Sequence, residues 1–147
     1  EFGNNVQLAQ RLGIEIEGEL GKQNNHPIGL TGTLAQDADF DSLQALIEQK
    51  LGRQPLAVKG KSKSIKSIAW CTGAAQNYIE LAVAAGVDAY ITGEVSEPTV
   101  HIARESGIHF FSAGHHATER YGVQAIGSYL AEKFGLEHEF IDIDNPV

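Results

Sequence analysis

Ile65-Lys-Ser-Ile-Ala-Trp-Cys-Thr-Gly73 is a short apolar segment that runs directly into a glycine turn. The same arrangement recurs at residues 88–93 (Asp-Ala-Tyr-Ile-Thr-Gly) and 108–114 (Ile-His-Phe-Phe-Ser-Ala-Gly). Each segment has the length and apolar content of a buried strand. Apolar residues at helical spacing follow each segment, and they predict helices that end near Ala85, Glu105 and Phe134. This alternation predicts βαβ crossovers, and therefore an α/β fold with a largely parallel or mixed sheet.

The flanking regions contain further elements. The pattern predicts a helix that ends near Leu12, a half-buried strand over 14–20, a loop over 21–26 and a second strand over 28–34. A helix capped by Asp39 or Asp41 is expected to end at Gly52, followed by a short strand over 55–58. The helix that begins after Gly114 is expected to be continuous and to carry an apolar face, and a last strand is expected over 137–142.

Composition limits the classes of protein that fit. A chain of 147 residues with 20% charged side chains and a net charge of −8 has the size and polarity of one globular domain. The acidic balance makes nucleic acid an unlikely partner, and no apolar run reaches the roughly 18 residues that span a bilayer. Cys71 is the single cysteine, which excludes an intrachain disulfide and a thiolate zinc cage and suits a reducing, cytoplasmic compartment.

A lysine-rich loop follows the predicted short strand. Lys59, Lys61, Lys63 and Lys66 are separated by glycine, serine and isoleucine, with no aromatic residue between them. Such charge runs are usually solvated, and the glycine spacing of a P-loop is missing. We therefore expect residues 59–64 to be a flexible loop and a possible boundary within the domain.

The polar residues after the glycine turns are the candidate site, because ligands bind at the carboxyl ends of strands in open α/β sheets. His115 and Glu119 have the i, i+4 spacing that places both on one helical face, where an imidazole and a carboxylate can share a metal. A capping histidine and a first-turn acid would show the same spacing. His116 and Arg120 occupy a neighbouring face, within reach of a substrate. Glu94 could face them across the crevice or, like Glu97, could favour the start of a helix.

Three segments of the chain resemble the GTP cyclohydrolase 1 type 2 family, also called the Nif-three-like family. They are Ala69-Trp-Cys-Thr-Gly73, Tyr90-Ile-Thr-Gly-Glu-Val-Ser-Glu97 and Gly114-His-His-Ala-Thr-Glu-Arg-Tyr-Gly122. The ending Phe140-Ile-Asp-Ile-Asp-Asn-Pro146 is similar as well. The resemblance extends over essentially the whole chain. It implies that residues 1–147 are the C-terminal portion of a longer protein and form one lobe of a two-lobed fold.

The resemblance also implies a site for two divalent metal ions, of which zinc, manganese, iron and nickel all suit the ligand types. Two of its ligands correspond to His115 and Glu119. The others are a His-His pair and an Asp from an upstream segment that has no counterpart here, so we expect a partial metal site.

The activity that the resemblance implies is metal-assisted opening of the GTP purine ring with release of formate. We consider Glu94 and His116 candidate catalytic groups for proton transfer, and Arg120 a candidate phosphate-binding residue. The alternative is a non-enzymatic, metal-binding scaffold or regulatory protein, because family members resemble toroidal homohexamers. The expected partners are therefore a small-molecule nucleotide and further copies of the chain, without a membrane.

Overall fold

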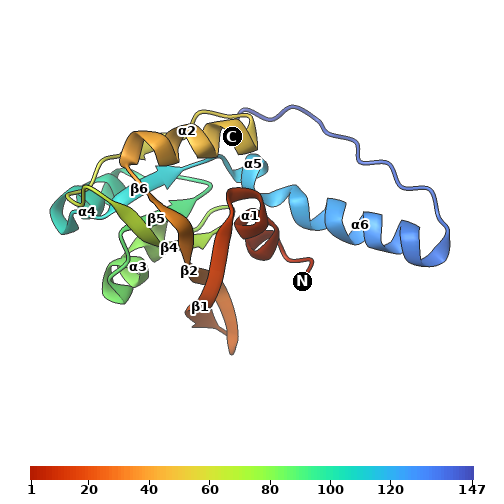
Figure 1. Ribbon diagram of the computed structural model, residues 1–147, viewed down its shortest axis with the longest axis horizontal. Helices are drawn as coiled ribbons and strands as arrows, with labels where there is room; N and C mark the ends of the chain where they lie inside the picture. Colours follow the sequence, from red (N-terminus) through yellow and green to blue (C-terminus); the bar gives the residue numbers. More distant parts are fainter.

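A six-stranded mixed sheet forms the centre of the molecule in the computed structural model, which describes residues 1–147 (Figure 1). The strand order is β1-β2-β4-β5-β6-β3. Neighbouring strands β4, β5 and β6 are parallel, whereas β1, β2 and β3 pair with their neighbours in the antiparallel sense. The bounds are β1 Ile14–Gln23, β2 His26–Ala38, β3 Leu56–Val58, β4 Ile65–Cys71, β5 Ala89–Thr92 and β6 His109–Ser112. The prediction of an α/β fold with a mixed sheet is thus confirmed.

Helices cover both faces of this sheet. One hydrophobic cluster joins α1 (Asn4–Leu12) and α2 (Phe40–Leu51) to the sheet, and a second cluster joins α3 (Ile79–Ala85) and α4 (Glu97–Ser106) to the opposite face. The alternation of side chains along a strand explains both clusters. Trp70 and Phe111 belong to the first, whereas their neighbours Ala69 and Phe110 belong to the second. The three central strands are therefore buried on both sides, as their apolar sequences require.

Several predicted helix ends follow the expected capping chemistry. Asp39 caps α2, and its Oδ1 accepts a hydrogen bond from the Ser42 amide at 2.7 Å. A glycine with positive φ closes α1, α2, α3 and α4, as the sequence predicts. The segment between Gly73 and α3 differs from the prediction of one helix, because residues Gln76–Tyr78 form a separate 3-10 turn, η1.

The expected loop over residues 21–26 is wrong. Strands β1 and β2 continue to Gln23 and from His26, so only Asn24 and Asn25 form the turn. Both asparagines have positive φ, 51° and 65°. Asparagine tolerates the left-handed region better than most residues, and a two-residue turn of this kind matches the twist of a hairpin. A polar stretch that resembles a loop is therefore mostly paired strand.

Two expectations for the C-terminal region are wrong. The helix after Gly114 is interrupted at Arg120, which divides it into α5 (His115–Glu119) and α6 (Tyr121–Phe134). The last strand, expected over 137–142, is absent, because no other strand pairs with this segment. We call residues 135–147 the C-terminal segment. It returns from the end of α6 towards α5 without regular structure (Figure 1).

Helix α6 extends away from the sheet, with the N-terminus of the chain beside it (Figure 1). Its sequence has the expected apolar face, but the side chains of this face are exposed rather than buried. They are Val123, Ile126, Leu130 and Phe134, with exposed fractions from 40% to 62%.

The lysine-rich loop is attached to the body through buried His109. The ring Nδ1 of His109 accepts a hydrogen bond from the Gly60 amide at 3.0 Å, and Nε2 lies 2.9 Å from the Ser62 carbonyl oxygen. Strands β3 and β4, on either side of the loop, belong to one sheet. The boundary within the domain that we expect near residues 59–64 stays a prediction. No helix in the structure is long and apolar enough to cross a membrane.

Candidate functional site

The carboxyl ends of β4, β5 and β6 converge at one edge of the sheet. The Gly93 amide donates to the Gly73 carbonyl at 3.0 Å, and the Gly114 amide donates to the Gly93 carbonyl at 2.9 Å. A Cβ at Gly93 would lie 2.8 Å from the His115 Cα, so this approach requires glycine. The three glycine turns that the sequence shows separately are therefore hydrogen-bonded neighbours, and they bring the residues that follow them together.

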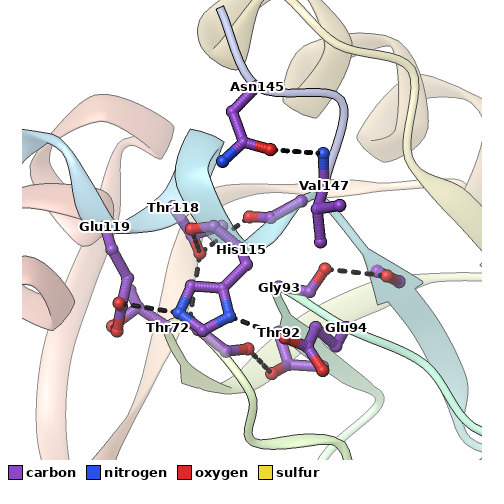
Figure 2. Close-up of polar contacts among 12 residues, drawn as sticks. Thr72, Thr92, Gly93, Glu94, His115, Thr118, Glu119, Asn145 and Val147 are labelled. Carbon is purple, nitrogen blue, oxygen red and sulfur yellow. Dashed lines mark hydrogen bonds and ion pairs between the residues drawn. The ribbon is translucent and has the colours of Figure 1, made fainter. Parts of the chain in front are cut away.

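His115 lies between two carboxylates at this edge (Figure 2). Its Nδ1 is 2.6 Å from Glu94 Oε1, and its Nε2 is 3.0 Å from Glu119 Oε2. The three side chains are 32% to 39% exposed. The structure thus brings together Glu94, which follows β5, with His115 and Glu119 of α5. Glu97 does not join them, because it pairs with His101 on the exposed side of α4.

The two carboxylates favour the protonated form of His115. The hydrogen bond to Glu94 raises the pKa of the imidazole above its ordinary value; partial burial opposes this effect, and the charge of Glu119 reinforces it. A protonated ring donates from both nitrogens, whereas a neutral ring donates from only one. The two contacts keep the ring in a defined orientation, with one nitrogen facing each carboxylate.

Thr72 and Gly73, which follow β4, position the Glu119 carboxylate. Thr72 Oγ1 donates to Glu119 Oε1 at 3.4 Å, and Thr118 Oγ1 accepts from the Gly73 amide at 3.1 Å (Figure 2). A Cβ built on Gly73 would lie 2.5 Å from Glu119 Oε1. The carboxylate consequently occupies the space that any larger residue at position 73 would need.

Gly73→Ala is expected to displace the Glu119 carboxylate. Gly73 has φ +69°, so the left-handed backbone cost of alanine should lower the free energy of unfolding by about 1 to 2 kcal/mol. Gly86→Ala is the matched control, because φ is +71° there and nothing lies within 4 Å of the new Cβ. Urea unfolding should show similar losses for both variants, since a terminal carboxylate can move away. Only Gly73→Ala should shift the side-chain NMR signals of His115, and unchanged signals would contradict this arrangement.

His116 and Arg120 point to a different carboxylate, which the sequence did not identify. His116 Nε2 is 3.0 Å from Asp142 Oδ1, and Arg120 NH1 donates to Asp142 Oδ2 at 2.7 Å. Arg120 NH2 also donates to the Leu51 carbonyl at 3.2 Å. The C-terminal segment, to which Asp142 belongs, therefore lies directly against α5. The Val147 carbonyl adds to this contact by accepting from the His116 amide at 3.1 Å.

Cys71 lies close to the site, but its thiol is buried and hydrogen-bonded. The side chain is 8% exposed, and its thiol donates to the Ile28 carbonyl at 2.8 Å. Burial, followed by the charge of Glu119, raises the thiol pKa to about 11. The thiolate, which is the reactive form, is therefore scarce at neutral pH.

The raised pKa of Cys71 predicts a loss of stability in alkali. Between the ordinary pKa of 9.0 and the folded value of about 11, only the unfolded chain releases this proton. The free energy of unfolding should then fall with rising pH, by about 2 to 3 kcal/mol in total once the pH exceeds the folded pKa. Urea unfolding at pH 8, 9.5 and 10.5 should show a steeper decline for the natural protein than for Cys71→Ala. Buried Tyr90, whose pKa is also raised, is present in both proteins and therefore does not account for a difference between them. Parallel declines would contradict the raised pKa of Cys71.

The donor set suits part of a divalent metal site. One imidazole and two carboxylates are ligand types that zinc, manganese and iron accept. No group of three or more His, Cys, Asp or Glu side chains in the structure could hold a metal ion by itself. The pairing of His115 Nδ1 with Glu94 nevertheless has the form in which a carboxylate orients a metal-binding imidazole. The chemistry of His115 and Glu119 fits two ligands of a metal site.

A mixed sheet with helices on both faces, whose parallel strands end at a cluster of imidazole and carboxylate groups, defines an α/β protein with a polar site at the carboxyl edge. More narrowly, the chain belongs to the Duf34/NIF3 (NGG1p interacting factor 3) family, whose model matches residues 1–146. The family resemblance seen in the sequence is thus confirmed.

Relatives of known sequence carry the name GTP cyclohydrolase 1 type 2 homolog. The protein of Pseudomonas aeruginosa is 58% identical over 99% of this chain, and that of Vibrio cholerae is 51% identical over 100%. The chain spans 58% and 59% of the length of these relatives. A solved structure described as protein ybgI, of unknown function, is 47% identical and has a TM-score of 0.93 over 100% of this chain and 58% of its own.

Proposed function

We propose that residues 1–147 carry part of the site of a metal-dependent hydrolase that acts on GTP or a related nucleotide. One observation carries the proposal: His115 is fixed between Glu94 and Glu119 where three parallel strands end. The names of the relatives in Pseudomonas and Vibrio support the choice of substrate.

In this proposal His115 Nε2 and Glu119 are ligands of a divalent metal, and a pair of histidines and an aspartate from outside the chain complete a two-metal site. The metal, when bound, would polarise water and the purine carbon that water attacks. Glu94 keeps its hydrogen bond to His115 Nδ1, which orients the ring, and is also placed to accept a proton. His116 is a second candidate for proton transfer, and Arg120 offsets phosphate charge. The free thiol of Cys71 and the nucleotide substrate suit the cytoplasm.

The experiment is an assay of formate release from GTP by the natural full-length protein loaded with a divalent metal. Formate should accumulate in proportion to GTP consumed and should be lost in His115→Ala. An intact, metal-loaded protein that releases no formate would overturn the cyclohydrolase proposal.

A second candidate function is a metal-binding homohexameric scaffold. The exposed apolar face of α6 supports it, because contiguous exposed apolar side chains mark surfaces that other protein covers. Under this alternative the full-length protein assembles and retains metal but releases no formate, so the same assay, combined with the oligomeric state, separates the two.

A further inference from the structure

A cavity of about 580 Å³ lies between the end of α2, helix α5 and the C-terminal segment. The basic and acidic side chains around this cavity come from different parts of the chain. The folded body contributes Arg53, His116 and Arg120, whereas the C-terminal segment contributes Asp142 and Asp144. Every ionisable group that the body offers to this cavity is thus basic, and both acidic groups come from the segment that lies over it.

Polar contacts hold the C-terminal segment in place. Asp142 reaches His116 at 3.0 Å and Arg120 at 2.7 Å, and its side chain remains 46% exposed. The apolar neighbours Ile141 and Ile143 are 75% and 73% exposed. Exposed ion pairs contribute little to stability. The segment therefore rests on α5 through the Asp142 carboxylate and the Val147 carbonyl, and not through burial of Ile141 and Ile143.

Asp142 leaves part of the donor capacity of Arg120 unused. The carboxylate takes NH1, and NH2 donates to the Leu51 carbonyl. The Nε atom is buried and has no hydrogen-bond partner. Arg53 lines the same cavity and forms no ion pair. A carboxylate brings one charge and two oxygens, whereas a phosphoryl group brings up to two charges and three oxygens. The basic groups suit the larger anion better.

We propose that His116 and Arg120, with Arg53 beside them, form a binding site for a phosphoryl group, and that the Asp142 carboxylate occupies this site until the ligand displaces it. His116 and Arg120 also line the neighbouring cavity of about 570 Å³ that contains His115 and Glu119. A phosphorylated small molecule bound through its phosphate would therefore reach the candidate metal site. The inference rests on the proposed function, in which Arg120 offsets phosphate charge, and it adds His116, Arg53 and the displacement of Asp142.

Asp142→Asn tests the proposal against Asp144→Asn as the matched control. Both changes remove one negative charge from the same segment at the same cavity, but only Asp142 contacts His116 and Arg120. The probe is inorganic pyrophosphate, titrated calorimetrically into the natural full-length protein with EDTA present, so that metal plays no part. Asp142→Asn should bind pyrophosphate roughly three- to tenfold more tightly than the natural protein, because the competing carboxylate is gone. Asp144→Asn should stay within about twofold.

Two further variants keep the result interpretable. Arg120→Gln and His116→Gln should each abolish the gain in the Asp142→Asn background, and His116→Gln retains a side-chain donor in case Arg120→Gln fails to fold. The proposal is overturned if Asp142→Asn leaves pyrophosphate affinity unchanged or weakens it. It is also overturned if Asp144→Asn has an equal effect, or if Asp142→Asn only lowers the melting temperature. Because metal is chelated and no hydrolysis is measured, failure here is distinct from failure of the formate assay.

Discussion

His115→Ala is expected to strip divalent metal from the natural full-length protein and to end formate release from GTP. The ring presents Nε2 beside Glu119 and is oriented through Nδ1 by Glu94, so alanine removes the proposed ligand and the group that contacts both carboxylates. Loss of an orienting partner alone typically costs 10- to 100-fold in metal affinity, so loss of the ligand should cost more than about 100-fold. Metal content after dialysis, measured by mass spectrometry, checks this expectation.

His101→Ala is the matched control for this experiment. His101 also pairs with a glutamate at i, i+4, Glu97, but on the exposed side of α4 and away from the glycine turns. It should retain metal and formate release in full. The side chain of His115 is 39% exposed, so its removal should leave the urea midpoint almost unchanged. Equal metal content in the two variants would show that His115 is not a ligand.

Trp70→Ala is expected to produce the largest loss of stability of any single change discussed for this chain. Trp70 is fully buried in the cluster beneath α1 and α2. Truncation of a buried tryptophan to alanine costs about 3 to 5 kcal/mol in the free energy of unfolding. Because Trp70 is the single tryptophan, far-UV circular dichroism in urea should replace fluorescence as the measurement.

The same change should loosen the edge of the candidate site. Trp70 Nε1 donates to the Asn5 carbonyl at 2.8 Å, and Asn5 Oδ1 accepts from the Thr72 amide at 2.9 Å. Trp70→Phe is the control that retains most of the buried volume but removes the donor, so it should lose less stability than alanine. If alanine and phenylalanine proved equally destabilising, the hydrogen bond to Asn5 and not packing would dominate.

The central sheet was predictable because each of its parallel strands is buried on both faces. Ile65–Cys71, Ala89–Thr92 and His109–Ser112 are short, mainly apolar segments, and a glycine follows each within two residues, so the local sequence is enough to predict their type and approximate bounds. The hairpin was less predictable, because polar side chains at Lys22 and Gln23 conceal backbone pairing. Pairing is a property of two segments, and the composition of one segment does not reveal it.

Within the candidate site, sequence reasoning could identify His115 and Glu119 from their spacing on one helix, and Glu94 from its position after a strand. It could not identify Asp142, which lies 22 residues beyond Arg120 in a segment without regular structure. No periodicity constrains where such a segment lies. The signal that was available is charge: two aspartates stand in the C-terminal segment of a chain whose helix α5 begins with His-His and is followed directly by Arg120.

Strand β1 is an edge strand that disfavours edge-to-edge pairing of two sheets. It forms one margin of the sheet, and Glu15, Glu17 and Glu19 are exposed along it. If two copies joined their sheets through β1, these carboxylates would be crowded together in a molecule that already carries a charge of −8. The opposite margin, β3, is three residues long and offers few free amides. A ring of subunits built from this chain would therefore not grow as a continuous sheet, and its contacts would have to involve helices or loops.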